Sequence, residues 1–476
     1  MSSALSRLRQ LQAQDRPIHG GRTLAYVFDS GLEEVDRLAA EAVAMYAGAN
    51  GLDPSAFPSM LVMENELVGF ACDLVEAPPT AVGTVTSGGT ESIMLAVQGA
   101  RDARPTIRNP TMVLPSTAHA SFLKAAAYFG VEPVVVPVDQ DFRAEVGAMA
   151  QAMTSDTVLA VASAPSYAHG VVDPVAWLGA AALAKHVPLH VDACIGGWIL
   201  AYAERIGRVK PAWNFSVPGV TSISVDLHKY GYTPKGASIL LHRTPADRKP
   251  TYFASAAWPG YTMVNTTMQS TKPGGPLAGA WLTVQSIGHE GYLDLARACL
   301  DAVDLIVAGV GAIDGVELAV HPDSSLVALV ADDSCDVFTI ADEMAERGWY
   351  VQPQMTWHGN PPTLHLSVSA ATLPLVDECL LALRESVAAA RQLGPVEVDR
   401  FILKILRELR PDKLTDEDLD ALLEAAGLAG EAGVASLPKR MAQINVLLNA
   451  AGPALREALL VAYLDRLFRP VRRPGP

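Results

Sequence analysis

The chain has 476 residues, half of them apolar, which is more than one small core can hold and predicts two or three domains. It carries 51 acidic against 36 basic residues, a formal net charge of −15. This acidic balance argues against a nucleic-acid partner or an anionic membrane surface, and leaves small polar molecules as candidate ligands.

The five cysteines are scattered, without a CxxC pair or a His/Cys cluster at zinc spacing, so we expect reduced thiols, a cytoplasmic location and no metal site. Residues 1–14 contain Arg7 and Arg9 but no apolar core like that of a signal peptide. No segment reaches the ~18 uncharged apolar residues of a membrane span. We therefore expect no transmembrane segment.

Residues 1–52 are predicted to form an N-terminal arm with a helix over 32–45, packed across another subunit or the domain surface. Residues 53–58 are rich in turn residues and lead into a predicted helix over 61–74. Strands, loops and helices then alternate. We predict strands at 83–86, 111–114, 134–138, 158–162, 188–191, 221–225 and 237–241, and helices at 92–102, 121–130 and 175–185. The alternation predicts an α/β fold, a mostly parallel sheet with helices on both faces, in a large domain of residues 53–290.

Residues 291–476 are predicted to form a smaller C-terminal α/β domain with a helical end. Its predicted elements are a helix at 295–310, strands at 316–320 and 325–330, a helix at 337–347 and a strand at 364–368. Beyond Leu373 the pattern is helical, with Thr415 as the N-cap of a helix over 416–426. We expect the basic, proline-rich tail, residues 469–476, to be frayed.

One lysine emerges directly from a predicted strand. The run 220–225 ends at Asp226, and His228 and Lys229 follow at once, ahead of two glycines. The carboxyl ends of strands in α/β sheets face the crevice where ligands bind. We predict that Lys229 forms a Schiff base with pyridoxal phosphate; the alternative is an exposed lysine after a strand.

Three further motifs follow predicted strands. Gly88, Gly89 and Thr90 lie between a strand and a helix, where backbone N–H groups bind phosphate, although the same residues fit a tight turn. Asp192 could keep a pyridine nitrogen protonated or cap a helix, and His119 could stack on the ring or be structural. The loop that contains Gly88 to Thr90 matches no nucleotide-binding motif. The combination of these three motifs with Lys229 predicts a pyridoxal-phosphate site more specifically than any single motif does.

The segments 83–93, 169–174, 188–197 and 217–236 resemble the sphingosine 1-phosphate lyase-like members of the group II pyridoxal-phosphate-dependent decarboxylase superfamily. Residues 50–58 and 272–275, and the end of the chain, carry weaker similarity. The resemblance implies a fold-type I enzyme that forms a homodimer with shared active sites at the subunit interface.

The resemblance also implies roles for single residues. Lys229 is then the Schiff-base lysine, Asp192 faces the pyridine nitrogen and His119 stacks on the ring. The phosphate end is held by Gly88, Gly89, Thr90 and His228, with Ser163 a further cofactor contact. Lys235 serves the substrate phosphate and proton transfer, and Tyr167 lies near the reacting atoms, although a packed aromatic fits Tyr167 equally well.

Departures from the pattern concern the substrate. Phe28 stands where the lyases carry a tyrosine, with Tyr26 two residues early, Asp53 replaces a histidine, and Lys272 replaces an arginine. Together with Asn50 and Lys235, Tyr26, Phe28 and Lys272 are the predicted substrate contacts. A long-chain sphingoid phosphate is therefore less firmly implied than the cofactor.

Three functions remain open from the sequence. The first is retro-aldol cleavage of a phosphorylated long-chain amino alcohol to an aldehyde and phosphoethanolamine. The second is decarboxylation of an aromatic or acidic amino acid, which the absence of an arginine from residues 364–370 disfavours. The third, an inactive interaction protein, is disfavoured by Asp192 and the His228–Lys229 pair.

Overall fold

The computed structural model describes residues 2–208, 211–425, 439–468 and 470, so the predicted frayed tail and the end of the predicted helix at 426 lie almost wholly outside the described residues. The chain groups into two compact units. The first comprises Met1–Val307, Val320–Ala328 and Leu366–Val376, and the second comprises Ala308–Ala319, Leu329–His365 and Asp377–Pro476. Residues 1–52, the predicted arm, fall within the first unit.

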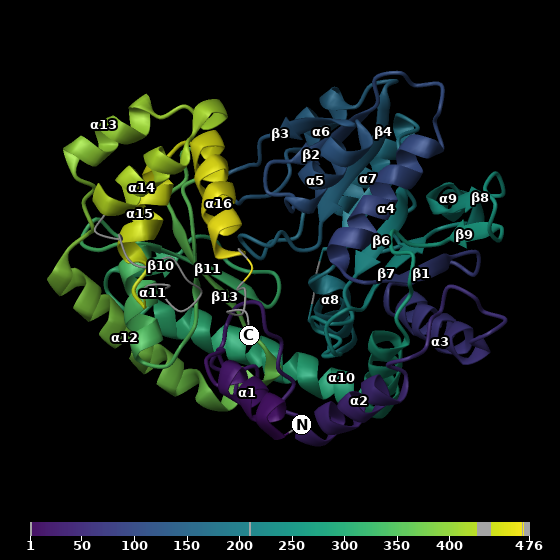
Figure 1. The fold of residues 1–476 in the computed structure, drawn as a ribbon, viewed down its shortest axis with the longest axis horizontal. Helices are drawn as coiled ribbons and strands as arrows, with labels where there is room; N and C mark the ends of the chain where they lie inside the picture. Colours follow the sequence, from purple (N-terminus) through teal and green to yellow (C-terminus); the bar gives the residue numbers. More distant parts are fainter. Residues whose placement is uncertain (1, 209–210, 426–438, 469, 471–476) are drawn as a thin grey trace, which may run out of the picture. The chain divides into compact units, whose positions relative to one another are not determined.

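The first unit is built on a seven-stranded sheet with the order β1-β7-β6-β5-β4-β2-β3 (Figure 1). The strands are β1 (Val82–Thr86), β2 (Thr111–Pro115), β3 (Glu132–Val136), β4 (Thr157–Ser163), β5 (Leu189–Asp192), β6 (Val220–Val225) and β7 (Ser238–His242). Only β7 runs antiparallel to its neighbours β1 and β6; the other neighbours pair in parallel. The predicted mostly parallel α/β sheet is confirmed.

Helices cover both faces of this sheet, and each face has its own core. Helices α4 (Gly89–Asp102) and α5 (Ser121–Phe129) contribute Ile93, Val97 and Phe122 to one apolar cluster. Helices α3 (Pro58–Leu74), α6 (Val146–Ala152), α7 (Val175–Ala184) and α8 (Gly196–Arg205) contribute to the other cluster. Because side chains alternate along a strand, Leu189 and Val191 of β5 belong to the second cluster.

Two element boundaries differ from prediction for reasons connected with proline. Helix α3 begins at Pro58 rather than at residue 61, because proline at the first helical position removes only an N–H that the helix leaves unpaired anyway. Strand β3 spans Glu132–Val136 rather than 134–138, and it includes Pro133. Since β3 is the edge strand of the sheet, a missing N–H is tolerated there.

Helix α8 was missed from the sequence because it begins with two glycines. A Cβ on Gly196 would lie 2.2 Å from the carbonyl oxygen of Ala164, and one on Gly197 would lie 2.6 Å from Val225. The two glycines therefore allow the helix to pack closely against neighbouring backbone and strand. This packing fixes the segment that follows Asp192.

The remaining elements of the first unit include α1 (Ser2–Gln12), α2 (Glu33–Met45), the short helices α9 (Pro245–Arg248) and η1 (Lys249–Thr251), and a hairpin of β8 (Phe253–Ser255) and β9 (Met263–Asn265). Helix α10 (Gly274–Val310) is interrupted at Gly288, whose φ of 59° lies in the left-handed region. The predicted helix at 295–310 is its second part.

The second unit combines strands and a helical end. A four-stranded sheet has the order β10 (Val316–Leu318), β11 (Leu326–Ala331), β13 (Thr363–Ser367) and β12 (Gln352–Gln354). The helices are α11 (Val337–Glu346), α12 (Val376–Leu393), α13 (Arg400–Glu408), η3 (Pro411–Lys413), α14 (Asp416–Ala425), α15 (Ala442–Ala450) and α16 (Pro453–Leu467). The short helix η2 (Ala370–Leu375) belongs to the first unit, as do residues 326–328 of β11 and 366–367 of β13. Leu406, Leu419, Leu455 and their neighbours form the core of this helical end.

None of the described helices combines the length and apolar character that crossing a bilayer requires.

Candidate active site

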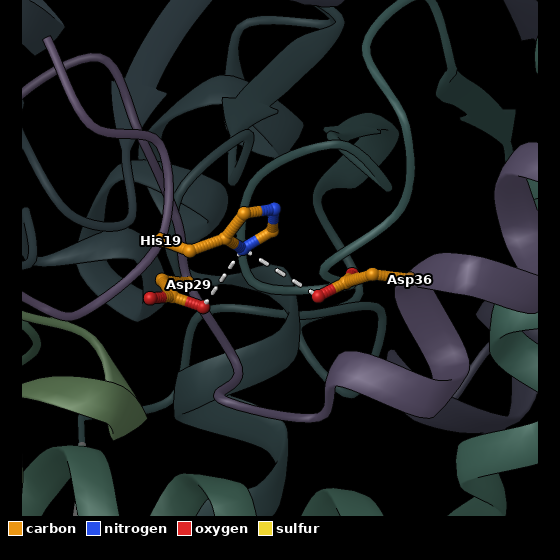
Figure 2. Close-up of side chains that lie close together, drawn as sticks. All are labelled: His19, Asp29 and Asp36. Atoms are coloured by element: carbon orange, nitrogen blue, oxygen red, sulfur yellow. Dashed lines mark ion pairs between the residues drawn. The ribbon is translucent and has the colours of Figure 1, made fainter.

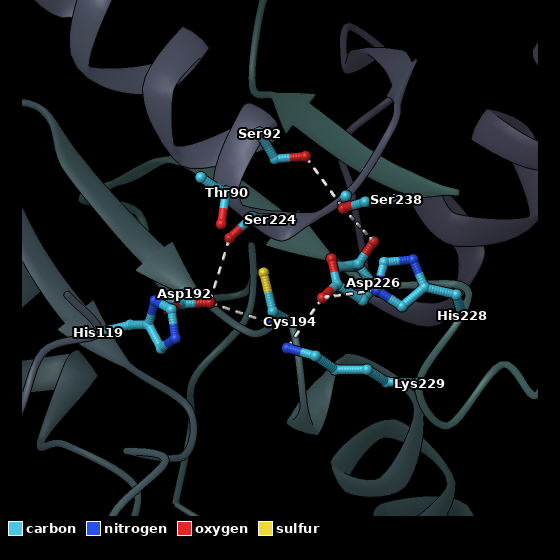
Figure 3. Close-up of polar contacts among 12 residues, drawn as sticks. Thr90, Ser92, His119, Asp192, Cys194, Ser224, Asp226, His228, Lys229 and Ser238 are labelled. Carbon is cyan, nitrogen blue, oxygen red and sulfur yellow. Dashed lines mark hydrogen bonds and ion pairs between the residues drawn. The ribbon is translucent and has the colours of Figure 1, made fainter. Parts of the chain in front are cut away.

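Four strand ends and the start of α4 surround one cavity of about 410 Å³ in the first unit. All eight predicted cofactor contacts and Tyr167 line it: Gly88, Gly89, Thr90, His119, Ser163, Tyr167, Asp192, His228 and Lys229. Figure 3 shows Lys229, Asp192 and His119 converging from different elements. Because the carboxyl ends of parallel strands share one sheet edge, residues more than a hundred positions apart meet here.

Lys229 is paired with a carboxylate three residues earlier. Its Nζ lies 2.8 Å from Oδ2 of Asp226, which is 1% exposed at the end of β6 (Figure 3). Burial acts to lower the pKa of Lys229, but the charge and hydrogen bond of Asp226 together with the neighbouring acidic groups of Cys194 and Asp192 outweigh burial and raise the pKa overall. Burial acts to raise the pKa of Asp226, and the charges of Lys229 and His228 hold it below the ordinary value. The pair holds Lys229 as an ammonium inside the cavity, and this ammonium must give up a proton before its amine can bond to a carbonyl carbon.

The loop from Ser87 to Thr90 packs closely against the side chains of Cys194 and Asp226. A Cβ on Gly89 would lie 2.8 Å from Sγ of Cys194 and 2.9 Å from both carboxylate oxygens of Asp226, so only glycine fits. Glu91 accepts hydrogen bonds from the backbone and side chain of Ser87, at 2.6 and 2.8 Å. The backbone N–H groups at the start of α4 thus line the cavity, where the helix dipole favours a phosphate.

His119 is held in one orientation from α5. Its Nδ1 accepts a hydrogen bond from the backbone N–H of Ser121 at 3.2 Å, so the neutral ring carries its proton on Nε2. Burial lowers the pKa of His119, with Asp192 acting in the opposite direction. Tyr167 meets the ring edge-on at a centroid distance of 6.4 Å. A neutral, oriented imidazole can stack on a flat aromatic cofactor.

The polar groups that line the cavity match the groups of pyridoxal phosphate that need partners. Ser163 Oγ and Asp226 Oδ1 are buried polar atoms without a hydrogen-bond partner in the described chain, as expected where a polar ligand supplies the partner. A helix N-terminus stands ready for a phosphate, Lys229 for the aldehyde carbon and Asp192 for a ring nitrogen. We therefore propose these residues as the cofactor contacts.

The predicted substrate contacts separate into two groups within a single chain. Lys235 Nζ donates to the backbone oxygens of Tyr26 and His228, at 3.1 and 3.3 Å, and lies 4.9 Å from the ring centre of Phe28. Neither Lys235 nor Phe28 is among the residues that line the 410 Å³ cavity. The interactions tie the N-terminal arm to the loop that follows Lys229.

The second group surrounds Lys272. Its Nζ lies 2.6 Å from both carboxylate oxygens of Glu64, and Asn50 accepts hydrogen bonds from the backbone N–H groups of Leu52 and Lys272. Glu64 and Lys272 both line a second cavity of about 270 Å³. Glu64 thus neutralises Lys272 and limits it as a phosphate ligand. Asp53, another predicted departure, accepts hydrogen bonds from Ser55 and shapes an exposed turn.

Three site residues were not assigned from the sequence: Asp226, Cys194 and Glu91. Asp226 had a signal, because a carboxylate at a strand end three residues before a lysine can pair with it. Cys194 lines the cavity two residues after Asp192, and burial raises the pKa of its thiol. Glu91 also accepts from the N–H of Met268 at 2.7 Å, a contact that no local pattern indicates.

A separate cluster outside the cavity joins His19, Asp29 and Asp36 (Figure 2). His19 Nδ1 lies 3.6 Å from each carboxylate. Asp29 is already engaged, because its oxygens accept hydrogen bonds from the N–H groups of Gly20, Gly21 and Gly31. We therefore assign this cluster to the folding of the N-terminal loop. The expected lack of a metal stays a prediction.

Gly89→Ala is expected to weaken pyridoxal-phosphate binding by on the order of tenfold or more, because overpacking beside Cys194 and Asp226 displaces the phosphate loop. Equilibrium dialysis or the visible absorbance titration measures this affinity. Gly147→Ala is the matched control, since a Cβ there meets open space on α6. Unchanged affinity in Gly89→Ala would show that the loop does not hold the cofactor.

Lys235 is expected to titrate near pH 8 in the cofactor-free protein. Burial and the charge of Lys229 lower its pKa to about 8, with Asp226 acting in the opposite direction. Acylation of Lys235, followed across pH by peptide mass spectrometry, should show this midpoint. Removing the second charge with Lys229→Met should move the midpoint upward; a midpoint near 10.5 in the parent protein contradicts the assignment.

The fold and the cavity together define a class: pyridoxal-phosphate enzymes of fold type I, with a lysine at the end of a strand in a mostly parallel sheet. The model of the pyridoxal-dependent decarboxylase conserved domain matches residues 23–331. A second model, named for a C-terminal helix-turn-helix (HTH) domain of pyridoxal-dependent enzymes, matches residues 400–466. The chain belongs to the pyridoxal-dependent decarboxylase family. Its cofactor is pyridoxal 5′-phosphate and its class of reaction is that of a lyase.

Comparison with single proteins shows which members of the family this chain is similar to. The curated sphingosine-1-phosphate lyase of Arabidopsis thaliana is 37% identical over 365 residues, covering 75% of this chain and 66% of that protein. The chain thus spans about two thirds of that relative's length. A solved sphingosine-1-phosphate lyase from Burkholderia pseudomallei is 33% identical with a TM-score of 0.77, over 82% of this chain and 91% of that one. A glutamate decarboxylase structure from Lactobacillus brevis, 20% identical with a TM-score of 0.72, covers 83% of this chain and 93% of that one and shows the fold alone.

The C-terminal helices differ in charge, because α13 carries Arg400, Lys404 and Arg407, whereas α14 begins with acidic residues. Helix α14 carries Asp416, Glu417 and Asp418 in its first turn, and Arg466 of α16 forms ion pairs with Asp416 and Asp420. Such an acidic helix would repel a nucleic-acid backbone. The expected absence of a nucleic-acid partner stays a prediction.

Proposed function

We propose that this chain cleaves a carbon–carbon bond in a phosphorylated long-chain amino alcohol similar to sphingosine 1-phosphate, releasing an aldehyde and phosphoethanolamine. The observation that carries the proposal is the meeting of Lys229, Asp226, Asp192 and His119 around one cavity. Sphingosine-1-phosphate lyases at 33–37% identity support the choice of substrate class.

When bound, pyridoxal phosphate supplies an electron sink for the bond that breaks at the substrate α-carbon. The residues of the chain hold and orient it. His119 would cover one face of the ring, Asp192 would keep the ring nitrogen protonated, and the Gly88–Thr90 loop with His228 would hold the phosphate. Asp226 holds Lys229 Nζ within the cavity, where the amine, once it has given up its proton, would bond to the carbonyl carbon of the cofactor.

Proton transfers complete the reaction. A base removes the proton from the β-hydroxyl, the Cα–Cβ bond breaks, the aldehyde departs, and a proton returns to the α-carbon. Tyr167 and Lys229 line the cavity, so we assign the proton transfers to them first. Lys235, with its lowered pKa, is a third candidate and the candidate ligand of the substrate phosphate.

The runner-up function is decarboxylation of an aromatic or acidic amino acid, in which the Cα–carboxylate bond breaks instead. A substrate carboxylate calls for a cation. Strand β13, where related amino-acid enzymes often place an arginine, reads Thr-Leu-His-Leu-Ser. This lack of a guanidinium favours a substrate without a carboxylate.

We also propose a homodimer in which a second copy completes the substrate site. The N-terminal helix α1 exposes Leu5, Leu8 and Leu11 by 51%, 62% and 44%. An apolar stripe of this kind is costly in water and suits an interface. Light scattering on the holoenzyme would give the mass of two chains; a monomer that is fully active would refute the proposal. The cytoplasmic location stays a prediction.

The test of function compares substrates by their products. The holoenzyme is incubated with sphingosine 1-phosphate and, separately, with aromatic and acidic amino acids. We expect a long-chain aldehyde and phosphoethanolamine in equal amounts from the first, with no carbon dioxide from the others. The Lys229→Arg variant measures the background. Carbon dioxide without aldehyde would establish the decarboxylase instead.

A further inference from the structure

A ladder of polar side chains lies behind Asp192 on one face of the sheet. In the β5–β6 register, His190 stands opposite Ser222 and Asp192 stands opposite Ser224. Since alternate residues of a strand point to the same face, all four side chains lie on one face of the sheet. His190 and Ser224 are fully buried, and Phe122 of α5 packs edge-on against the imidazole at 5.8 Å.

Hydrogen bonds connect the four groups in sequence. His190 Nδ1 lies 2.9 Å from Ser222 Oγ, and its Nε2 lies 3.2 Å from Ser224 Oγ. Ser224 donates in turn to Asp192 Oδ1 at 3.3 Å, a bond that Figure 3 marks. The Cys194 N–H donates to the same oxygen at 3.1 Å.

The chemistry of the groups fixes the direction of the chain. A carboxylate only accepts, so the Ser224 hydroxyl must donate to Asp192. Ser224 Oγ then accepts from Nε2–H of a neutral His190, and the bare Nδ1 accepts from the Ser222 hydroxyl. Burial lowers the pKa of His190 to about 4, which keeps the ring neutral. Both hydrogen bonds that Asp192 receives in the described chain end on Oδ1, which leaves Oδ2 for a ligand.

We infer that His190, acting through Ser224, is a positioning residue that orients Asp192 Oδ2 toward the pyridine nitrogen of the cofactor. The inference rests on the proposed role of Asp192. Aligned donors in a low-dielectric interior strengthen one another and hold a carboxylate in one orientation. Without His190, Ser224 is free to turn away and Asp192 loses one of its two anchors.

The test measures cofactor binding and the visible spectrum as well as activity. Relative to the parent holoenzyme, His190→Leu and Ser224→Ala should each weaken pyridoxal-phosphate affinity about tenfold, as expected for one hydrogen bond to a charged group. Each should also shift the visible absorption maximum and lower kcat with little change in KM. Ser224→Ala makes the smaller change in volume and serves if His190→Leu does not fold.

Two further variants separate positioning from packing. His190→Gln restores the interactions, because its amide can donate to Ser224 and accept from Ser222, and should stay within about threefold of the parent affinity. His242→Leu is the matched control: His242 lies opposite Ser222 on β7, is also buried, with 5% exposed against 0% for His190, and its Nε2 has no partner in the described chain. It should keep the parent spectrum.

Two results overturn the inference alone: parent affinity and spectrum in both His190→Leu and Ser224→Ala, or an equal loss in His242→Leu. A parent protein that shows no Lys229-dependent absorption band overturns the proposed function, and this inference with it.

Discussion

Replacing Lys229 with alanine is expected to abolish the visible absorption band of the holoenzyme and to lower turnover by on the order of 10⁴-fold, about 5.5 kcal/mol in activation free energy. We propose that the lysine amine bonds to the cofactor carbonyl, and Lys229 is the single lysine in the cavity lining. Absorbance spectra and product release measure both effects.

The alanine variant also leaves the Asp226 carboxylate buried without its partner, which costs on the order of 3–5 kcal/mol of folding free energy. Lys229→Arg separates the two effects, because it retains a cation beside Asp226 but cannot form the bond. We expect it to keep the thermal stability of the parent and still show no band. A Lys229→Arg holoenzyme with an unchanged spectrum would contradict the role of Lys229.

The second large effect is expected at Asp192. Asp192→Ala should keep the visible band, because Lys229 is intact, yet lower kcat by on the order of 10³-fold, about 4 kcal/mol. The loss follows because an unprotonated pyridine nitrogen is a poor electron sink. Steady-state kinetics with the parent substrate measure the change.

Asp192→Asn separates charge from shape. The amide fills the same space and can still accept from Ser224, but it lacks the charge that holds a proton on the ring nitrogen. We expect its kcat to resemble that of Asp192→Ala. An Asp192→Asn enzyme with near-parent turnover would remove the electrostatic role from Asp192.

The sequence was sufficient to predict which residues meet around the cavity because of how the cavity is built. Gly88, His119, Asp192 and Lys229 each follow a strand of a mostly parallel sheet, and such strands end at one edge. Predicting the strands was therefore enough to predict that these residues meet. Asp226 also follows a strand, but only the structure shows that it is buried beside Lys229.

The neighbours of the proposed substrate residues were not predictable in the same way, because these contacts depend on pairings between distant segments. Glu64 of α3 and Lys272 are 208 positions apart, and no local pattern indicates that they pair. The contacts of Lys235 with Tyr26 and Phe28 likewise depend on where the N-terminal arm lies. Helix α8 was missed because its glycines serve close packing, which only the tertiary structure reveals.

The most direct test of the central claim is the position of the covalent bond to the cofactor. The holoenzyme is reduced with borohydride, digested, and its peptides are mapped by mass spectrometry. The account predicts a pyridoxyl group on Lys229 in the peptide that also contains His228, and none on Lys235 or Lys272. A pyridoxyl group on Lys235, or on no lysine of the cavity, would contradict it.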